Sequence, residues 1–379
     1  MCGLAGMLLP APVASAEVLQ AQVLAMGEAL HHRGPDDGGS WVDAGAGIAL
    51  AHRRLSILDL SPLGHQPMAS SDGRYVMAYN GEVYNFATLR AELEPLGHAF
   101  RGHSDTEVLL AAILQWGMEE TLQRCNGMFA IALWDRQAQC LWLARDRVGK
   151  KPLYYGWAGD TLVFGSELKA LWQYPAFDND IDRDALTLLL RLDYIPAPHS
   201  IHQRCYKLMP GRVLRLDAEA VAAGASAHRP EQAQRPYWDA RARMQAALAA
   251  PFQGRIEEAE EQLDGLLRDA VALRMVADVP VGVLLSGGLD SSLLVALLSK
   301  LGHQDIRTFS IGFDAVDEHS GDEFRYLDII ARTFGTDHEQ IRIGGDRALE
   351  ALPNAIAAMS EPMVSHDSVA FYLLSSEVA

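Results

Sequence analysis

A cysteine stands second in the chain, between Met1 and Gly3. Small residues at the second position permit removal of the initiator methionine, which would leave Cys2 with a free α-amine beside its thiol. An α-amine has a pKa near ~7.7–8, so it accepts the thiol proton at neutral pH. The thiolate then attacks a carbonyl carbon with its base in the same residue, and no histidine partner is needed. Cys2 is therefore a candidate nucleophile.

Further along the chain are side chains that an amide-hydrolysing cysteine needs. Asn80 and Gly81 follow the apolar run Tyr75–Tyr79, and a side-chain amide with a glycine N–H at a strand end forms an oxyanion hole. Arg54 suits a substrate carboxylate, and Asp105 suits an α-ammonium group. Each has an ordinary alternative, because Asn-Gly is also a hairpin turn, Asp105 also belongs to a helix cap, and Arg54 is also a plausible surface residue.

A second candidate site follows the apolar run Val279–Leu285. The run leads into the string Ser286-Gly287-Gly288-Leu289-Asp290-Ser291-Ser292. A buried strand that delivers a glycine-rich turn to a helix N-terminus presents backbone N–H groups to phosphates. Serine hydroxyls add donors, and Asp290 is a candidate ligand for Mg²⁺. The string lacks the Gly-Lys-[Ser/Thr] ending of a Walker loop, and a plain turn with a helix cap is the alternative.

The elements that must position the first site are short strands and two helices. Short β-branched and aromatic runs bounded by Gly, Asn and Asp predict strands of sheets. Examples are Tyr75–Tyr79, Phe129–Trp134, Cys140–Ala144 and Leu162–Gly165. We expect one helix over Ala16–Leu30 and another from Ser104 to about Gln115, where Ser-Asp-Thr-Glu forms a capping box. Residues 2–217 therefore predict a two-sheet α+β domain.

The pattern changes in the second half of the chain. Residues 218–234 are rich in Ala, Gln and His without periodicity, and we interpret them as a loop within a linker over 218–250. Residues 251–379 alternate strand and helix, which predicts a parallel α/β sheet. The expected helices are Ile256–Val276, Ser292–Leu301, Phe324–Phe334 and Ala370–Ala379, and the expected strands are Val279–Leu285, Thr308–Phe313 and Glu339–Ile343.

Composition excludes several classes of function. The 379 residues carry a formal net charge of −17, which disfavours binding to nucleic acid or to an anionic membrane. No apolar run approaches the ~18–20 residues that span a bilayer. The four cysteines form no CxxC pair, and the first basic side chain is Arg33, too late for a signal peptide. We expect a cytoplasmic protein with small-molecule partners.

Taken in order, the motifs resemble one enzyme family. They are Met1–Gly6 (MCGLAG), His32–Asp36 (HRGPD), the Arg54 segment, Asn80–Asn85 (NGEVYN), Ser104–Glu107 (SDTE), Asn126–Ala130 (NGMFA), Ala144–Arg147 (ARDR), Lys151–Gly156 (KPLYYG) and Phe164–Leu171 (FGSELKAL). This series resembles the class II glutamine amidotransferase domain of the glutamine-hydrolysing asparagine synthetases. The string after Val279–Leu285 is similar to the PP-loop of ATP pyrophosphatases, which the same family carries in its second domain.

The resemblance implies a fold and a set of roles. It implies an Ntn-hydrolase αββα sandwich followed by an incomplete PP-loop α/β domain. Cys2 would be the nucleophile, and Asn80 with Gly81 the oxyanion hole. Glutamine would bind to Arg54, Leu55, Ile57, Asn80, Gly81, Glu82 and Asp105. ATP would bind to Leu285, Ser286, Gly287, Gly288, Leu289, Asp290, Ser291, Ser292 and Ile311, with Asp290 as the Mg²⁺ ligand.

The implied reaction couples two sites. Glutamine is hydrolysed at Cys2 through a thioester, and the ammonia passes to a carboxylate that ATP has adenylated. The substrates would be glutamine, ATP and a carboxylate acceptor, and a homodimer fits the resemblance. Aspartate is the default acceptor, with asparagine, AMP and pyrophosphate as products. A PP-loop enzyme that modifies tRNA is disfavoured by the acidic charge and by the lack of zinc-type cysteines.

Two departures from the family keep alternatives open. The family continues into a Ser-Gly-[Glu/Gln]-Gly-x-Asp-Glu loop that is not in these 379 residues, so a fragment, or a glutaminase-only or regulatory protein, is the second hypothesis. Gly321–Phe324 and Met359–Asp367 differ from the usual pattern. They are closer to relatives that amidate N-acetylglutaminylglutamine, and other relatives amidate uronic-acid sugars. His366 and Asp367 would then contact a different acceptor, although drift in a surface loop explains them equally well.

Overall fold

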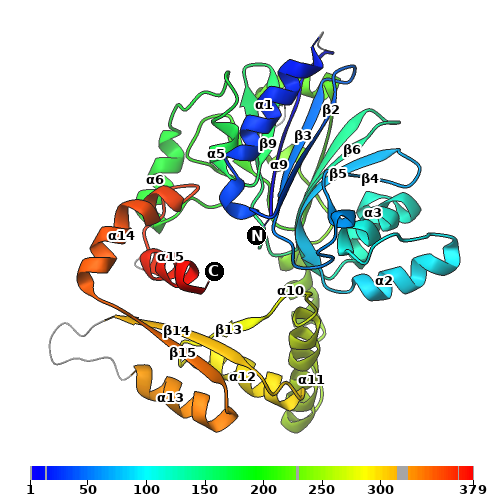
Figure 1. The fold of residues 1–379 in the computed structure, drawn as a ribbon. Helices are drawn as coiled ribbons and strands as arrows, with labels where there is room; N and C mark the ends of the chain where they lie inside the picture. The colour runs from blue at the N-terminus through cyan, green and yellow to red at the C-terminus, as the bar shows by residue number, and fades with distance from the viewer. Residues whose placement is uncertain (1, 13–14, 228–229, 314–322, 366, 379) are drawn as a thin grey trace. The chain divides into compact units, whose positions relative to one another are not determined.

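The computed structural model describes residues 2–12, 15–227, 230–313, 323–365 and 367–378 (Figure 1). The chain divides into two compact units. The first comprises residues 1–250 with the short segment Ser360–Pro362, and the second comprises residues 251–359 and 363–379. Gly321, Asp322 and His366, which the sequence singles out for the acceptor, lie outside the described residues.

Two six-stranded sheets form the centre of the first unit. One sheet contains β1 (Gly3–Leu8), β2 (Asp37–Asp43), β3 (Ile48–Arg54), β8 (Tyr154–Ala158), β9 (Thr161–Gly165) and β10 (Cys205–Lys207). The other contains β4 (Met68–Ala69), β5 (Tyr75–Val83), β6 (Gly127–Asp135), β7 (Cys140–Arg145), β11 (Arg212–Asp217) and β12 (Arg235–Pro236). Their orders are β10-β8-β9-β1-β3-β2 and β12-β11-β7-β6-β5-β4, and the paired strands are antiparallel.

Alternation along the strands shows how the sheets stack. In β6, Ala132 and Trp134 belong to the core between the sheets, whereas Ile131 and Leu133 belong to the core under the helices. Successive side chains of a strand point to opposite faces, so both faces of this strand are buried. That double burial is why β6 reads as a continuous apolar run in the sequence.

Helices cover the outer face of each sheet. The first sheet is covered by α1 (Ala16–Glu28), α5 (Leu168–Leu171) and α6 (Arg183–Leu192), and the second by α2 (Phe86–Leu93), α3 (Asp105–Trp116) and α4 (Met118–Arg124). Three 3-10 turns, η1 (His31–Arg33), η2 (Pro62–Gly64) and η3 (Glu94–Leu96), join the elements. The layer order is αββα (Figure 1), which confirms the predicted two-sheet fold.

The predicted loop over residues 218–234 is wrong. The structure forms α7 (Ala218–Ala222), α8 (Gly224–Ala227) and α9 (Pro230–Ala233) there, and α10 (Ala240–Ala249) follows β12. Alanine is the strongest helix former, and the Asp217 carboxylate caps α7 by accepting a hydrogen bond from the Ala220 N–H. Val221 is fully buried in the core between the sheets. One buried apolar residue and one capping residue do not produce the repeating apolar pattern from which a helix is predicted.

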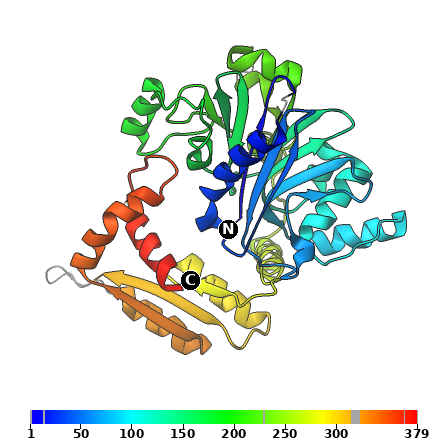
Figure 2. The same cartoon turned by 45° about the horizontal axis from the view of Figure 1, so that its top comes forward.

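The second unit is a parallel α/β sheet, as the alternation predicts. Its elements are α11 (Ile256–Arg274), β13 (Gly282–Leu284), α12 (Leu289–Lys300), β14 (Arg307–Phe313), α13 (Glu323–Phe334), β15 (Asp337–Ile343), α14 (Gly345–Ala358) and α15 (Asp367–Val378). The strands pair in the order β13-β14-β15. Helices α12 and α13 lie on one face of this sheet and α14 and α15 on the other (Figure 2).

The segment Ser360–Pro362 belongs to the first unit through specific contacts. The Leu168 N–H donates to Ser360 Oγ at 3.0 Å, and the Ile201 N–H donates to Glu361 Oε1 at 2.9 Å. Glu361 also forms an ion pair with Lys207. A sequence boundary at residue 251 does not reveal that these three residues return to the first unit.

Candidate active site

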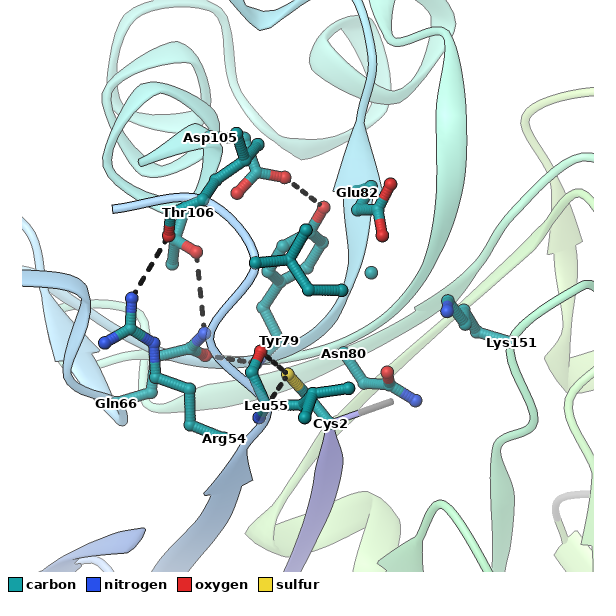
Figure 3. Close-up of a pocket in the computed structure, with 13 residues that line it drawn as sticks. Cys2, Arg54, Leu55, Gln66, Tyr79, Asn80, Glu82, Asp105, Thr106 and Lys151 are labelled. Atoms are coloured by element: carbon teal, nitrogen blue, oxygen red, sulfur yellow. Dashed lines mark hydrogen bonds between the residues drawn. The ribbon is translucent and has the colours of Figure 1, made fainter. Parts of the chain in front are cut away.

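A pocket in the first unit brings the candidate residues of the N-terminal half together (Figure 3). It is lined by Cys2, Arg54, Leu55, Ile57, Leu58, Gln66, Tyr79, Asn80, Gly81, Glu82, Asp105, Thr106 and Lys151. All eight residues singled out from the sequence for the nucleophile, the oxyanion hole and glutamine binding are in this set. Five others, Leu58, Gln66, Tyr79, Thr106 and Lys151, were not identified from the sequence.

Cys2 precedes β1, and alternation explains where it lies. It shares its parity with Leu4 and Leu8, which occupy the core between the two sheets. Cys2 Sγ lies 3.6 Å from the Leu55 carbonyl and 3.4 Å from the Leu55 N, so the thiol both donates and accepts. The Arg33 Nε–H donates to the Cys2 carbonyl at 2.9 Å and holds the backbone. Burial raises the pKa of the Cys2 thiol.

Asn80 is fully buried and lines the pocket, yet its side chain is unpaired. Neither Oδ1 nor Nδ2 has a hydrogen-bond partner among the described residues. Buried polar groups are normally paired, so an unpaired amide beside a pocket is available to a ligand. The Asn80–Glu82 segment was expected at the end of a strand. It instead lies inside β5, which continues to Val83 through its pairing with β6.

Gly81 lies where the backbones of β5 and β6 approach each other closely. A Cβ built at this position would lie 2.4 Å from the Met128 carbonyl oxygen and 2.7 Å from Phe129 Cβ. Only glycine therefore fits here without moving β6. The glycine keeps Asn80 and Glu82, its two neighbours, at the wall of the pocket.

The Arg54 guanidinium is held by the loop that follows β3. One terminal nitrogen donates to the Ser61 carbonyl at 3.1 Å, and the other donates to the Leu58 carbonyl at 3.2 Å and contacts the Asp59 carbonyl. A Cβ at Gly64 would lie 1.9 Å from this guanidinium, so glycine there makes room for it. Arg54 is buried, and its position in the pocket wall is fixed by backbone groups.

Asp105 begins α3, where Ser104 supplies the predicted cap by accepting from the Glu107 N–H at 3.3 Å. One carboxylate oxygen accepts from both Tyr79 Oη and the Val83 N–H, each at 2.8 Å. Desolvation raises the pKa of Asp105 to about 6, against these hydrogen bonds and with a smaller contribution from the Glu82 charge. The site therefore holds a carboxylate that changes charge just below neutral pH.

Two of the residues missed from the sequence brace this wall. Gln66 Oε1 accepts from the Tyr79 N–H at 2.7 Å, and its Nε2 lies 3.5 Å from Thr106 Oγ1. Tyr79 in turn holds Asp105. Nothing in the sequence marks Gln66, because it acts only after distant segments meet. Thr106 and Lys151 lie in the motifs Ser104–Glu107 and Lys151–Gly156, but the motifs do not indicate that these two side chains reach the pocket.

The candidate phosphate site forms a turn in the second unit. Gly287 has φ +75°, a left-handed conformation that glycine adopts without strain, and Gly288 is the N-cap of α12. The helix begins at Leu289, three residues earlier than expected, because two glycines end the turn. The Ser286 N–H donates to Ser291 Oγ at 3.2 Å. Leu289 is 90% exposed and points away from any packed surface.

The other predicted nucleotide contacts lie beside this turn. Leu285 is buried and its N–H donates to the Phe309 carbonyl on β14 at 2.8 Å, while Ile311 lies two residues further along β14. Asp290 and Ser292 lie in the first turn of α12, and Ser292 Oγ donates to the Gly288 carbonyl at 2.8 Å. Within the described ranges, no cluster of three metal-ligating side chains is present. The site therefore offers an Mg²⁺ ion one carboxylate, together with serine hydroxyls.

Among the helices that the structure describes, none combines the length and apolar character needed to cross a membrane.

Family comparisons match both units. The model for the glutamine amidotransferase domain matches residues 1–229, and the model for asparagine synthase matches residues 262–379. Each is matched over the range that its motifs occupy, which places the pocket in the first match and the glycine-rich turn in the second.

Three relatives carry related names. "Asparagine synthetase [glutamine-hydrolyzing] 1" of Bacillus subtilis is 31% identical over 100% of this chain and 56% of its own length. A putative asparagine synthetase of Methanocaldococcus jannaschii is 33% identical over 89% of this chain and 64% of its own. A putative asparagine synthetase of Mycobacterium tuberculosis is 34% identical over 100% and 57%. The chain thus spans between half and two thirds of the length of these relatives.

One solved structure is a glutamine phosphoribosylpyrophosphate amidotransferase of Bacillus subtilis. It is 16% identical, with a TM-score of 0.45, over 93% of this chain and 92% of that one.

Proposed function

Because the chain belongs to the glutamine amidotransferase family and continues into an asparagine synthase domain, we propose that it is a glutamine-dependent, amide-forming ligase. Its first unit hydrolyses glutamine to glutamate and ammonia. The observation that carries this proposal is the unpaired, fully buried amide of Asn80 in the pocket that Cys2 enters. A buried amide without partners is costly unless a ligand uses it.

The proposed hydrolysis begins with Cys2 after Met1 has been removed. The α-amine of Cys2 takes the thiol proton, and the sulfur attacks the side-chain amide carbon of glutamine. The Asn80 amide and the Gly81 N–H hold the negative charge that develops on the amide oxygen. The C–N bond breaks, ammonia leaves with the returned proton, and water hydrolyses the thioester to release glutamate and the free thiol.

The amino-acid end of glutamine is recognised by charge. The Arg54 guanidinium, fixed by backbone carbonyls, pairs with the α-carboxylate. Asp105 and Glu82 face the α-ammonium group, while Leu55 and Ile57 line the wall beside the aliphatic stem. This arrangement sets the side-chain amide at Cys2 and rejects amino acids whose side chains are shorter.

The second unit is proposed to adenylate a carboxylate. Ser286–Ser292 would hold the phosphates of ATP, with the adenine between Leu285 and Ile311. Asp290 would bind Mg²⁺, which neutralises phosphate charge when it is bound. Aspartate is the proposed acceptor, supported by the names of the relatives, and the product is asparagine. We place the reaction in the cytoplasm, where glutamine and ATP are available.

The first experiment measures glutamate released from glutamine by the purified protein, beside Cys2→Ala and Cys2→Ser. Intact mass establishes whether Met1 has been removed in each preparation. We expect release from the parent protein and none above background from either variant. A protein that has lost Met1, remains folded and releases no glutamate would refute the glutaminase proposal.

A further inference from the structure

The backbone of Lys151 makes two hydrogen bonds that do not depend on its side chain. Its N–H donates to Asp146 Oδ2 at 2.9 Å, and its carbonyl accepts from Arg145 Nε at 2.7 Å. These bonds hold the segment after β7 whatever side chain position 151 carries. The position of the Lys151 ammonium group therefore needs a separate explanation.

The Lys151 ammonium is directed into the pocket and forms no ion pair with any residue that the structure describes. Lys151 is 3% exposed, and in Figure 3 its Nζ faces the space beside Asn80 and Glu82. Among the residues the structure describes, no hydrogen bond or ion pair involves this Nζ. Buried lysines are rare unless they are paired, and an unpaired buried charge is strongly unfavourable. A lysine that served only packing would be better replaced by an apolar residue.

The charges of the pocket show what this cation faces. Arg54 is the other cation in the pocket wall, and backbone carbonyls already hold its guanidinium. Asp105 and Glu82 are the acidic groups, and they suit the ammonium end of an amino acid. The reaction also needs a negative sulfur on Cys2. In the described part of the pocket, Lys151 is the cation without a hydrogen-bonded partner, and the charges of Glu82 and Cys2 both raise its pKa.

We propose that Lys151 is a further functional residue of the glutamine hydrolysis, acting through Cys2: its ammonium group stabilises the Cys2 thiolate. The inference rests on the glutaminase function proposed above. It adds to it a fixed side-chain charge, which stabilises the thiolate that forms when the α-amine of Cys2 takes the thiol proton.

The surrounding titratable groups are consistent with this role. Burial is the main cause that lowers the pKa of Lys151, and the Arg33 charge adds to it, whereas Glu82, Cys2 and Asp146 raise it. For the Cys2 thiol, burial raises the pKa most and the Asp105 charge adds to it. The Leu55 hydrogen bond, the charge of the chain's N-terminus and the Lys151 charge lower this pKa, in that order. Among these groups, Lys151 is the one whose side-chain charge stabilises the thiolate.

The test measures Cys2 directly. Iodoacetamide modifies thiolates, and Cys125, Cys140 and Cys205 are buried, so the alkylation of the peptide that carries Cys2 is followed by mass spectrometry from pH 6 to pH 11. The variants are Lys151→Met, which keeps the stem, and Lys151→Arg, which keeps the charge. Lys150→Met is the matched control, because Lys150 is the adjacent lysine and is exposed. Only preparations that have lost Met1 are compared.

We expect Lys151→Met to move the midpoint of the alkylation curve up by about one pH unit and to slow alkylation at pH 7 about tenfold. Lys151→Arg should recover most of the rate, and Lys150→Met should match the parent protein. An unchanged curve for Lys151→Met, in a protein with the parent's unfolding temperature, would overturn the inference. Equal losses in Lys151→Met and Lys151→Arg, together with a lowered unfolding temperature, would also overturn it, because they indicate a structural role.

Failure of the proposed function gives a different result. If the parent protein releases no glutamate, the glutaminase proposal is lost. The alkylation curves then still decide whether Lys151 acts on Cys2, because they need neither glutamine nor turnover.

Discussion

At the scale of single residues, the pocket contains two polar side chains whose cost to the fold is explained by the reaction proposed for it. The Asn80 amide is fully buried and Lys151 as a residue is 3% exposed, and no hydrogen bond or ion pair among the described residues involves either polar group. The polar groups behind them are well paired, as with Asp105, Tyr79 and Gln66. The unpaired groups therefore lie at the pocket surface, and the paired groups support them.

Substitution of Asn80 should impair catalysis without lowering the stability of the fold. We expect Asn80→Ala to lower kcat for glutamine hydrolysis by about 10²–10³-fold, because it removes an oxyanion donor. The unfolding temperature should stay the same or rise, since neither amide atom makes a hydrogen bond to any residue that the structure describes. Steady-state kinetics and thermal unfolding measure the two effects.

Asn85 provides the control for Asn80. Its Oδ1 accepts from the Asn126 N–H at 2.8 Å, and its Nδ2 donates to the Arg124 carbonyl at 3.0 Å. Asn85→Ala should cost about 1–3 kcal/mol of stability and leave kcat unchanged. An Asn80→Ala protein that unfolds early and keeps its kcat would show that Asn80 is a structural residue.

Glutamine binding should weaken as the pH falls through about 6. The pKa of Asp105 is raised to about 6 by desolvation, so at pH 7.5 the group is mostly ionised and at pH 5 mostly protonated. A protonated Asp105 cannot pair with an α-ammonium group. We expect the Kd for glutamine, measured by calorimetry on Cys2→Ala, to rise about tenfold between pH 7 and pH 5.

The same pKa shift predicts the opposite sign for stability. The folded state holds the Asp105 proton more tightly than the unfolded state, so the contribution of Asp105 to the unfolding free energy falls as the pH rises from about 4 to about 6. Asp105→Asn should abolish both pH dependences. A Kd for glutamine that is flat from pH 8 to pH 5 would contradict the assigned role.

At the scale of elements, the turn after β7 is organised by one carboxylate. Asp146 is fully buried. Its Oδ2 accepts from the Phe129 and Lys151 N–H groups, at 3.1 and 2.9 Å, and its Oδ1 from those of Val148 and Lys150, at 3.2 and 3.0 Å. The Asp146 side chain accepts from four backbone N–H groups, and these bonds replace the backbone hydrogen bonds of a β-ladder, which a turn cannot form.

Removal of this carboxylate should unfold the turn. We expect Asp146→Ala to lower the unfolding free energy by about 3 kcal/mol or more, because several buried N–H groups lose their acceptor. Chemical denaturation measures the loss. Asp160→Ala, at an exposed turn, should stay within about 0.5 kcal/mol of the parent. Equal stabilities for the two variants would show that Asp146 does not organise the turn.

The element boundaries show which local signals were decisive. Capping residues predicted α3 well, since Ser104 and Glu107 act within one helical turn. The end of β5 was placed four residues too early, because Asn80 and Gly81 read as a turn. Pairing with β6 carries the strand through them. Cross-strand pairing involves a segment almost 50 residues away, which a local pattern does not contain.

At the scale of the whole molecule, the two candidate sites lie in separate units with separate cores. The pocket that contains Cys2 is formed entirely by residues 2–151. The glycine-rich turn lies on the parallel sheet of the second unit, whose core involves α14 and α15. Each site is thus built from residues of its own unit.

This separation predicts that a substitution in either site leaves the function of the other site unchanged. Asp290→Ala should weaken ATP binding, measured by equilibrium dialysis with Mg²⁺ present, by about tenfold or more and leave glutamate release unchanged. Cys2→Ala should abolish glutamate release and leave ATP binding unchanged. If Asp290→Ala binds ATP as the parent does, the proposed Mg²⁺ role is wrong. Loss of both activities in either variant would instead show that the units do not function independently.

The amino-acid sequence by itself determined the candidate reacting groups and the order of the elements. Cys2, the Asn80–Glu82 segment and the Ser286–Ser292 string could be identified because each is a short, contiguous pattern. The two-sheet and parallel α/β classes followed from alternation and apolar runs, which are also local.

Only the tertiary structure decided which side chains remain unpaired and which support them. Gln66, Tyr79 and Asp105 come together from three segments, and Lys151 reaches the pocket from a fourth. A residue's burial and its lack of a partner depend on every segment packed around it, and such long-range packing leaves no periodic trace in the sequence. For the same reason the helices within residues 218–233 could not be predicted from the sequence. Their burial depends on the sheets against which Val221 packs.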